Sequence, residues 1–276
     1  MALNSINTNA SAMTALSNLA STQSTLQQTQ NIISTGKKIN TAKDNGAIWS
    51  IANTMQGKVT SYDSVSDSLN RAQSTIDVAM SAGEQVSDLL TQMKAKALAA
   101  SDTSLDTTSR QALNADFTSL RDQITSVVSN ADFNGINMVK SAGTTVYALA
   151  NDSGSSKLTV QAEDLSLGGG NVTLSATASF ATAGAASAFI GTLNTDLENV
   201  NIALTHLGTG SNSLARQMKF VSSLQDSLNQ GISNLVDADM AVESAKLSAL
   251  QTKQQLGVQA LSIANQSSST LLALFR

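Results

Sequence analysis

Residues 48–100 read IWSIANTMQGKVTSYDSVSDSLNRAQSTIDVAMSAGEQVSDLLTQMKAKALAA, with apolar residues recurring at alternating steps of three and four. Only Lys58 and Gly83 are not apolar in this ladder, which spans more than seven heptads. Its positions are Ile48, Ile51, Met55, Lys58, Tyr62, Val65, Leu69, Ala72, Ile76, Ala79, Gly83, Val86, Leu90, Met93, Ala97 and Ala100. Such a sustained pattern predicts a coiled-coil helix. The helix would be ~80 Å long, more than the ~50 Å diameter of a compact globule of this size, so a rod is expected.

Two further ladders follow along the chain. The second contains Leu113, Phe117, Leu120, Ile124, Val127 and Ala131, and the third runs from Leu193 to Leu235. Residues 101–108 are rich in turn and capping residues, which suits a chain reversal between the first two helices. Gly208 and Gly210 lie in the third ladder, where they favour a local kink without breaking its register. The sequence therefore predicts a mainly α-helical fold, a long antiparallel coiled-coil bundle.

Composition excludes several classes of protein. The 276 residues include no cysteine and no proline, so disulfide scaffolds and thiolate metal sites are excluded. A net charge of −4 with only 13% charged residues argues against a nucleic-acid surface. No apolar run approaches the ~18 residues of a membrane span, so membrane insertion is not expected. The first residues lack the basic and apolar regions of a cleaved signal peptide.

Both ends of the chain have helical apolar patterns that do not fit one coiled-coil seam: the N-terminal pattern is too weakly apolar, and the C-terminal apolar face is too wide. The N-terminal ladder is Ala12, Leu16, Leu19, Gln23, Leu26, Gln30 and Ile33, with glutamine at two of seven positions. The C-terminal apolar residues, between Leu256 and Phe275, cover more than one seam. We therefore expect the ends to meet other chains, and to become helical mainly on assembly. The residues expected at such contacts are Ile6, Ala12, Leu16, Leu19, Leu26, Ile33, Leu256, Leu261, Ile263, Leu271, Leu272, Leu274 and Phe275.

Residues 140–186 have a different character. Three short strand-like pieces, 146–149, 157–160 and 172–175, are separated by the turn sequences Asn151–Gly154 and Gly168–Gly170. They predict a small β-hairpin insert on the bundle. A flexible linker is the alternative, particularly for residues 176–188.

No catalytic or metal-binding constellation is visible. The single histidine, His206, is expected on a helix surface, and Trp49 is expected to pack. Asp237, Asp239 and Glu243 do not converge on one face of a helix, so they indicate a solvated or partner-facing surface. Gly168–Gly170 lacks the remaining residues of a phosphate-binding loop, and no serine lies in a nucleophile-elbow sequence. We expect no enzyme activity and no cofactor.

Several short motifs resemble those of bacterial flagellins of the shorter α-proteobacterial type. Residues 34–44, STGKKINTAKD, are similar to the family's "SSGxRINSAxDD" segment, and residues 132–138, DFNGINM, resemble its "FNGxNLL" mark. The start INTN, the later DADMAVE and ANQ, and the terminus LLALFR resemble further marks in the same order. Two departures occur in the first motif, where Lys38 replaces the usual arginine and residues 45–49 replace "DAAGL".

The resemblance implies an arrangement in layers. Residues 1–45 and 236–276 would pair as the inner core of a filament, and residues 46–139 and 187–235 would form the surrounding helical layer. Residues 140–186 would replace the larger outer domains of longer flagellins. The implied function is that of a structural subunit that polymerises into the flagellar filament for swimming. The implied partners are other flagellin subunits, an export chaperone, the filament cap and hook-junction proteins. The implied location is extracellular, after type III export without a cleaved signal peptide.

The resemblance also concerns immune recognition. Flagellins detected by the vertebrate Toll-like receptor carry arginine and leucine in a segment that corresponds to residues 90–99, where this chain has Gln92 and Lys96. We therefore expect a degenerate receptor segment, comprising Gln92, Lys96 and Asp116, and poor receptor activation.

Two other functions stay open: a hook–filament junction protein of the same superfamily, and a cytoplasmic coiled-coil scaffold.

Overall fold

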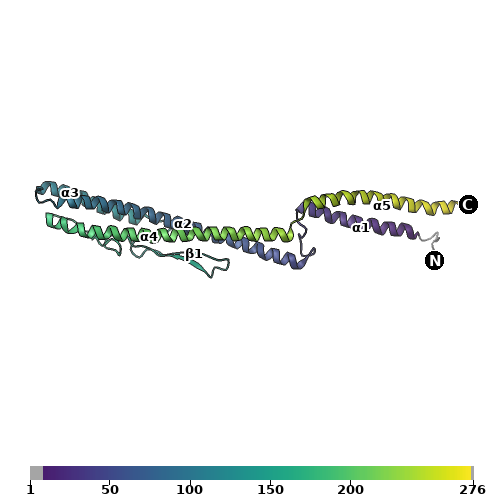
Figure 1. The fold of residues 1–276 in the computed structure, drawn as a ribbon, viewed down its shortest axis with the longest axis horizontal. Helices are drawn as coiled ribbons and strands as arrows, with labels where there is room; N and C mark the ends of the chain where they lie inside the picture. Colours follow the sequence, from purple (N-terminus) through teal and green to yellow (C-terminus); the bar gives the residue numbers. More distant parts are fainter. Residues whose placement is uncertain (1–8, 275–276) are drawn as a thin grey trace. The chain divides into compact units, whose positions relative to one another are not determined.

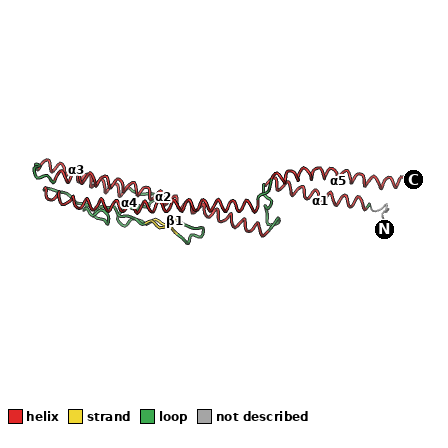
Figure 2. The backbone as a smooth tube through the Cα atoms, viewed as in Figure 1, coloured by secondary structure: helices red, strands yellow, loops and turns green. Residues whose placement is uncertain are grey.

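The computed structural model describes the backbone of residues 9–274 and the side chains of residues 9–266. The chain is mainly helical, with one two-stranded sheet in the described part (Figures 1 and 2). The elements are α1 (Ala10–Thr35), α2 (Gly46–Ala100), α3 (Thr107–Asn130), β1 (Val146–Leu149), β2 (Lys157–Val160), α4 (Ala183–Val236) and α5 (Met240–Leu274). They divide into two compact units: a terminal unit, Met1–Gly57 with Ser227–Arg276, and a central unit, Lys58–Asp226.

The central unit is an antiparallel helical bundle, as the ladders predict. The Gln73 side-chain amide on α2 donates to the Ser211 hydroxyl on α4 at 2.7 Å, and a Cβ added to Gly83 would lie 2.7 Å from Leu204. Residue numbers thus rise on α2 while they fall on α4. The chain reverses after α2, as expected, because Arg110 donates hydrogen bonds to three backbone carbonyls of the turn.

The first ladder is buried from Val65 onward. Its fully buried positions include Leu69, Ile76, Leu90, Met93, Ala97 and Ala100. Before Val65 two of the predicted positions are wrong: Ile51 is 53% exposed and Lys58 is exposed, whereas their neighbours Ala52 and Val59 are buried. The predicted positions Ile48 and Tyr62 are partly buried and packed. From Val59 to Val65 the buried positions advance by three residues twice, through Tyr62, instead of by four and then three. Before Tyr62, the buried stripe therefore includes the residue that follows Ile51 and the one that follows Lys58. At the first of these places both alternatives, Ile51 and Ala52, are apolar, so only the packing selects between them; at the second, Val59 is apolar and Lys58 is not.

The predicted hairpin is present, but its third piece is not a strand. β1 and β2 pair antiparallel, with Val146 opposite Val160. Residues 172–175 are irregular because the buried carboxylate of Asp196 on α4 accepts hydrogen bonds from the backbone N–H groups of Thr173 and Leu174. A strand at this place would need those groups for its own pairing.

The segment between the hairpin and α4 is packed, so the flexible-linker alternative is wrong. Phe180 is buried, and its ring lies edge-on to that of Phe117, with centroids 5.1 Å apart. α4 begins at Ala183, ten residues before the start of its predicted ladder at Leu193, and continues without a break through Gly208 and Gly210. No helix in residues 9–274 combines the length and apolarity that crossing a membrane requires.

Candidate functional site

The helix pair α1–α5 holds most of the residues expected at contacts with other chains. Asn9 caps α1, since its side-chain oxygen accepts from the Ala12 N–H at 2.9 Å, and its amide nitrogen donates to the carbonyl of Ala264 at 2.8 Å. At the other end of α1, Gly36 takes the left-handed conformation with φ of 70° and its carbonyl accepts from the Ala238 N–H. These contacts pair the two helices antiparallel along their described length.

One seam joins the two helices. On α1 it consists of Ala12, Ala15, Leu19, Thr22, Leu26, Thr29 and Ile33, and on α5 of Glu243, Leu247, Leu250, Gln254, Gly257, Leu261 and Ala264. Four predicted positions of the N-terminal ladder lie in this seam. The other three, Leu16, Gln23 and Gln30, are exposed, and the residue one place before each lies in the seam instead. Both choices have heptad spacing, and the small threonines and alanine suit the close approach of α5 better than leucine and glutamine do.

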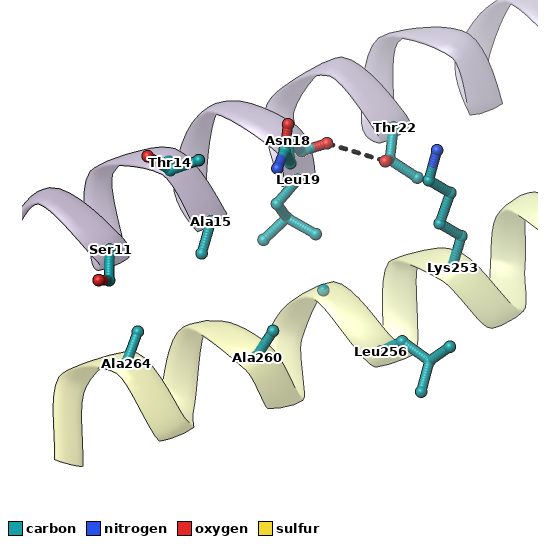
Figure 3. Close-up of a pocket in the computed structure, with 11 residues that line it drawn as sticks. Ser11, Thr14, Ala15, Asn18, Leu19, Thr22, Lys253, Leu256, Ala260 and Ala264 are labelled. Carbon is teal, nitrogen blue, oxygen red and sulfur yellow. Dashed lines mark hydrogen bonds between the residues drawn. The ribbon is translucent and has the colours of Figure 1, made fainter. Parts of the chain in front are cut away.

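This seam is small and partly polar. The Thr22 hydroxyl donates to a carbonyl of its own helix, and the buried Thr29 hydroxyl has no hydrogen-bond partner. Leu19 contacts Gly257, where an added Cβ would lie 3.2 Å from its side chain. Toward the start of α1 the helices leave a hollow of about 630 Å³ (Figure 3), lined by Ser11, Thr14, Ala15, Asn18, Leu19, Thr22, Lys253, Leu256, Gly257, Ala260 and Ala264. The pair buries little apolar surface for its length.

Large apolar side chains lie on the outside of the same pair. Leu16 and Met13 on α1 are 56% and 63% exposed, and Leu256 and Ile263 on α5 are 58% and 67% exposed. Val242 and Val258 are exposed as well. Large apolar side chains that are more than half exposed in this number indicate an interaction surface. It is the chief chemical feature of the terminal unit.

The structure divides the expected contact residues into three groups. Leu16, Leu256 and Ile263 lie exposed on the outside of the pair, and Ala12, Leu19, Leu26, Ile33 and Leu261 lie in its seam. Ile6 and Phe275, and the side chains of Leu271, Leu272 and Leu274, lie outside the described residues. Sequence reasoning missed Met13 and Val242, although their seven-residue spacing from Ala20 and Ala249 was a readable signal.

The remaining polar candidates have local roles. His206 is exposed, as expected, and its Nδ1 lies 2.9 Å from a carboxylate oxygen of Glu163. Asp239 accepts from the N–H groups of Ala241 and Val242 and so starts α5. Among the residues described here, no three carboxylates or imidazoles group closely enough to hold a metal ion.

The expected receptor segment lies on the central unit. Gln92 on α2 is exposed, and Lys96, one turn later, forms an ion pair with Asp116 on α3 at 2.7 Å. A cation therefore stands where the resemblance places an apolar anchor, and it is held by a neighbouring carboxylate.

Comparison with known proteins identifies the family. Residues 6–144 match the bacterial flagellin N-terminal helical region, and residues 190–275 match the bacterial flagellin C-terminal helical region. Flagellin FljM of Caulobacter vibrioides is 58% identical over the full length of both chains, and FljO of the same organism is 56% identical. A flagellin of Brucella melitensis is 40% identical over 99% of each chain.

A solved structure agrees at the level of fold. The crystal structure of Bacillus cereus flagellin aligns with a TM-score of 0.50 at 19% identity, covering 55% of this chain and 86% of that one. The long helices, the exposed terminal pair and the full-length similarity lead to one conclusion. This chain belongs to the bacterial flagellin family, the structural subunits that polymerise into the extracellular flagellar filament.

Proposed function

We propose that the α1–α5 pair is the surface through which this flagellin polymerises. The observation that supports the proposal is the exposure of Leu16, Leu256 and Ile263, each more than half exposed on helices whose own seam is small and polar. Exposed apolar area stabilises an assembly by roughly 25 cal/mol for each Å² that it removes from water. A pair with this distribution gains more from neighbouring copies than from its own seam.

The layered arrangement implied by the resemblance is part of the proposal. Residues 1–45 and 236–276 would form the inner core, residues 46–139 and 187–235 the surrounding layer, and residues 140–186 the outermost part. The last segment contains only a hairpin of two four-residue strands and packed loops, so the filament would have a thin exterior. The subunit would be purely structural and carry out no reaction.

Export is the second part of the proposal. We infer that the chain leaves the cell through the flagellar export apparatus without cleavage, aided by an export chaperone, and adds beneath a filament cap on a hook junction. A chain without cysteine or proline needs neither oxidation nor prolyl isomerisation before it folds, which suits this route. The mass of the secreted protein tests it: the expected mass is that of the uncleaved N-terminus, and a shortened N-terminus contradicts the proposal.

The filament is a better assignment than the hook–filament junction. Proteins named flagellin match the chain end to end at 56–58% identity. Several such flagellins occur in Caulobacter vibrioides, so a mixed polymer is included in the proposal.

Substitution of the exposed leucines tests the proposed surface. We expect Leu16→Gln with Leu256→Gln to abolish filament formation, measured by sedimentation and electron microscopy, because each change places an amide in an apolar contact. The matched control is Ser248→Gln with Thr252→Gln, which changes two exposed polar positions on α5. Normal filaments from the leucine variant, or none from the control, would contradict the proposal.

A further inference from the structure

The sequence contains two Asn–Gly steps, Asn45–Gly46 and Asn134–Gly135, and all four residues are exposed. An asparagine followed by glycine is the step at which a protein chain most readily loses a side-chain amide, because glycine has no side chain to hinder its backbone nitrogen. The two steps lie in different structures: one begins α2, and the other forms a tight turn after α3. Their reactivity is therefore expected to differ.

Asn45 is fixed as the cap of α2. Its side-chain oxygen accepts a hydrogen bond from the Ile48 N–H at 3.1 Å, and its backbone carbonyl accepts from the Trp49 N–H at 2.9 Å. Gly46 is the first residue of the helix. For the Gly46 nitrogen to attack the Asn45 side chain, the cap and the first helical turn would both have to open. The structure therefore protects this amide.

The side chain of Asn134 has no such restraint. Asn134 and Gly135 are the central residues of a turn closed by two 3.0 Å hydrogen bonds between the backbones of Phe133 and Ile136. Their φ angles of 53° and 81° are the left-handed pair that favours Asn–Gly in two-residue turns. Within the described part of the chain the Asn134 amide forms no hydrogen bond, and nothing lies within 4 Å of a Cβ added to Gly135. The Asn134 amide is therefore free to rotate in an open site.

One hydrogen bond restrains the backbone nitrogen of this turn. The Gly135 N–H donates to a carboxylate oxygen of Asp132 at 2.9 Å. The nitrogen has to lose its proton before it can attack the Asn134 side chain, and a hydrogen bond to a carboxylate favours the protonated form. Because Asp132 is exposed, water competes for this bond and its opening costs little. The bond therefore slows the reaction without preventing it.

An unpaired cation lies beside the same turn. Asn134 and Phe133 line a hollow of about 370 Å³ together with Arg71 and Thr75 of α2. The Arg71 guanidinium is exposed and forms no ion pair within residues 9–266. A carboxylate at position 134 would share this hollow with the guanidinium, so the two charges would attract each other.

We infer that Asn134 is a site of spontaneous deamidation, and that the carboxylate formed there pairs with Arg71. The Gly135 nitrogen loses its proton to water and attacks Cγ of Asn134. The new C–N bond closes a succinimide ring, the Cγ–Nδ2 bond breaks, and the amide nitrogen takes up a proton and leaves as ammonia. A water molecule then opens the ring at either carbonyl and leaves aspartate or isoaspartate. The chain gains water and loses ammonia, and nothing is oxidised or reduced.

The two products affect the turn differently. Aspartate tolerates the left-handed conformation as asparagine does, so the turn and the Phe133–Ile136 hydrogen bonds persist. In isoaspartate the main chain runs through the former side chain and is longer by a methylene group, so a two-residue turn cannot close over it. Aspartate therefore changes the charge of this face, whereas isoaspartate also opens the turn.

Ageing of the full-length chain tests the site. The chain is kept in mildly alkaline buffer and digested with trypsin, which places the two steps in separate peptides, residues 44–58 and 122–140. Mass spectrometry follows the gain of about 1 Da that accompanies the change from amide to carboxylate. We expect roughly tenfold more product at Asn134 than at Asn45, since the capped amide needs a larger opening. Equal product at the two steps, more at Asn45, or none at either overturns the inference.

Two controls show whether the structure sets the preference. In concentrated urea both steps are expected to react at similar rates, because the cap and the turn are lost. Asp132→Ala frees the Gly135 N–H and is expected to raise the rate at Asn134 several-fold while leaving Asn45 unchanged. A preference for Asn134 that persists in urea, or an unchanged rate in Asp132→Ala, would overturn the structural argument.

The pairing with Arg71 is tested separately in Asn134→Asp, which reproduces the aspartate product. Carbon NMR is expected to show that the new carboxylate titrates at lower pH in Asn134→Asp than in the same variant with Arg71→Gln, because a nearby cation favours the ionised form. The matched control adds Arg216→Gln, an exposed arginine of α4 that does not line the hollow, and should leave the titration unchanged. The same midpoint with and without Arg71 overturns the pairing, whatever the ageing experiment shows.

Discussion

The two helical regions of this flagellin distribute their apolar side chains in opposite ways. In the central unit Leu69, Ile76 and Leu90 are fully buried, whereas on α1 of the terminal unit the most buried apolar side chain, Leu26, keeps 8% of its surface exposed. The terminal pair leaves Leu16 and Ile263 more than half exposed. The central unit therefore carries its own core, whereas under the proposed function the terminal pair obtains much of its apolar burial from other copies. We therefore expect the central unit to be folded before assembly and the terminal pair to become fully ordered only within the polymer.

The largest expected difference is in hydrogen exchange of the monomer. Amides of α1 and α5 should exchange roughly a thousandfold faster than those of Leu69 to Met93, a difference of about 4 kcal/mol in opening free energy. In the filament the two regions should be protected alike, and helicity by circular dichroism should rise on polymerisation. If the amides of α1 and α5 were protected from exchange equally in the monomer and in the filament, the terminal pair would not depend on other copies, which would contradict the comparison.

The next largest effect should come from removing a central aromatic side chain. Phe117 is fully buried and packs against Phe180 and Phe189. Phe117→Ala should lower the free energy of unfolding of the monomer by about 3–5 kcal/mol, measured by urea denaturation. The counterpart in the terminal unit, Leu26→Ala, should change it by less than about 1 kcal/mol but weaken polymerisation. Similar losses from both variants would mean that the monomer already has two complete cores.

Sequence periodicity predicts the central unit better than the terminal one, for a physical reason. From Val65 to Ala100 only one stripe is apolar, so the buried face follows from spacing alone. On α1 the alternatives Ala15 and Leu16 both fit a heptad, and the shape of α5 decides between them. The N-terminal ladder misses Thr22 and Thr29 for the same reason, since threonine gives no apolar signal in the sequence and its burial here depends on the packing of α5.

Contacts distant in sequence limit the prediction of the insert. Residues 172–175 have strand-like composition, but the Asp196 carboxylate, more than twenty residues later, takes their backbone donors. No pattern within residues 172–175 predicts that contact. The expected contact residues at the ends follow from composition, whereas their division into seam and outer stripes requires the pairing of α1 with α5.

The central unit also differs from the terminal pair in that polar contacts occupy its exposed α2–α3 surface. Lys96 is paired with Asp116 where the resemblance places leucine. We expect the unchanged chain to activate a Toll-like receptor reporter cell weakly. Gln92→Arg with Lys96→Leu should raise the response roughly tenfold or more, since it restores a forked cation and an apolar anchor. Thr91→Arg is the control on a neighbouring exposed position, and a strong response from the unchanged chain would refute the expectation.

A smaller effect should separate two neighbouring glycines of the central unit. Gly208 has nothing within 4 Å of an added Cβ, so Gly208→Ala should stabilise α4 by up to about 1 kcal/mol. At Gly210 the added Cβ would lie 2.6 Å from a methyl group of Val160, so Gly210→Ala should displace β2 and cost about 1–3 kcal/mol despite the same gain in helix propensity. Thermal unfolding of the two variants measures the difference. If both substitutions stabilised the protein, β2 could move away from α4 at no measurable cost.

The smallest expected effects are at two exposed carboxylates, one in each unit. The hydroxyl and the backbone N–H of Ser109 hold the pKa of Asp106 below its ordinary value of 3.8, and the backbone N–H groups of Thr41 and Asn40 do the same for Asp44. Each carboxylate therefore contributes stability that is present above pH 3.8 and is lost as the pH falls through the lowered pKa.

Carbon NMR titration of the monomer measures both groups. Asp106 should titrate below 3.8, and Ser109→Ala should move its pKa upward while leaving that of Asp44 unchanged. An Asp106 that titrates at 3.8 in the unchanged chain would contradict the capped start of α3. Asp44 extends the comparison to the terminal unit: if its pKa is lowered in the monomer as well, the bend at residues 40–44 forms before assembly, and the dependence on neighbouring copies is confined to α1 and α5.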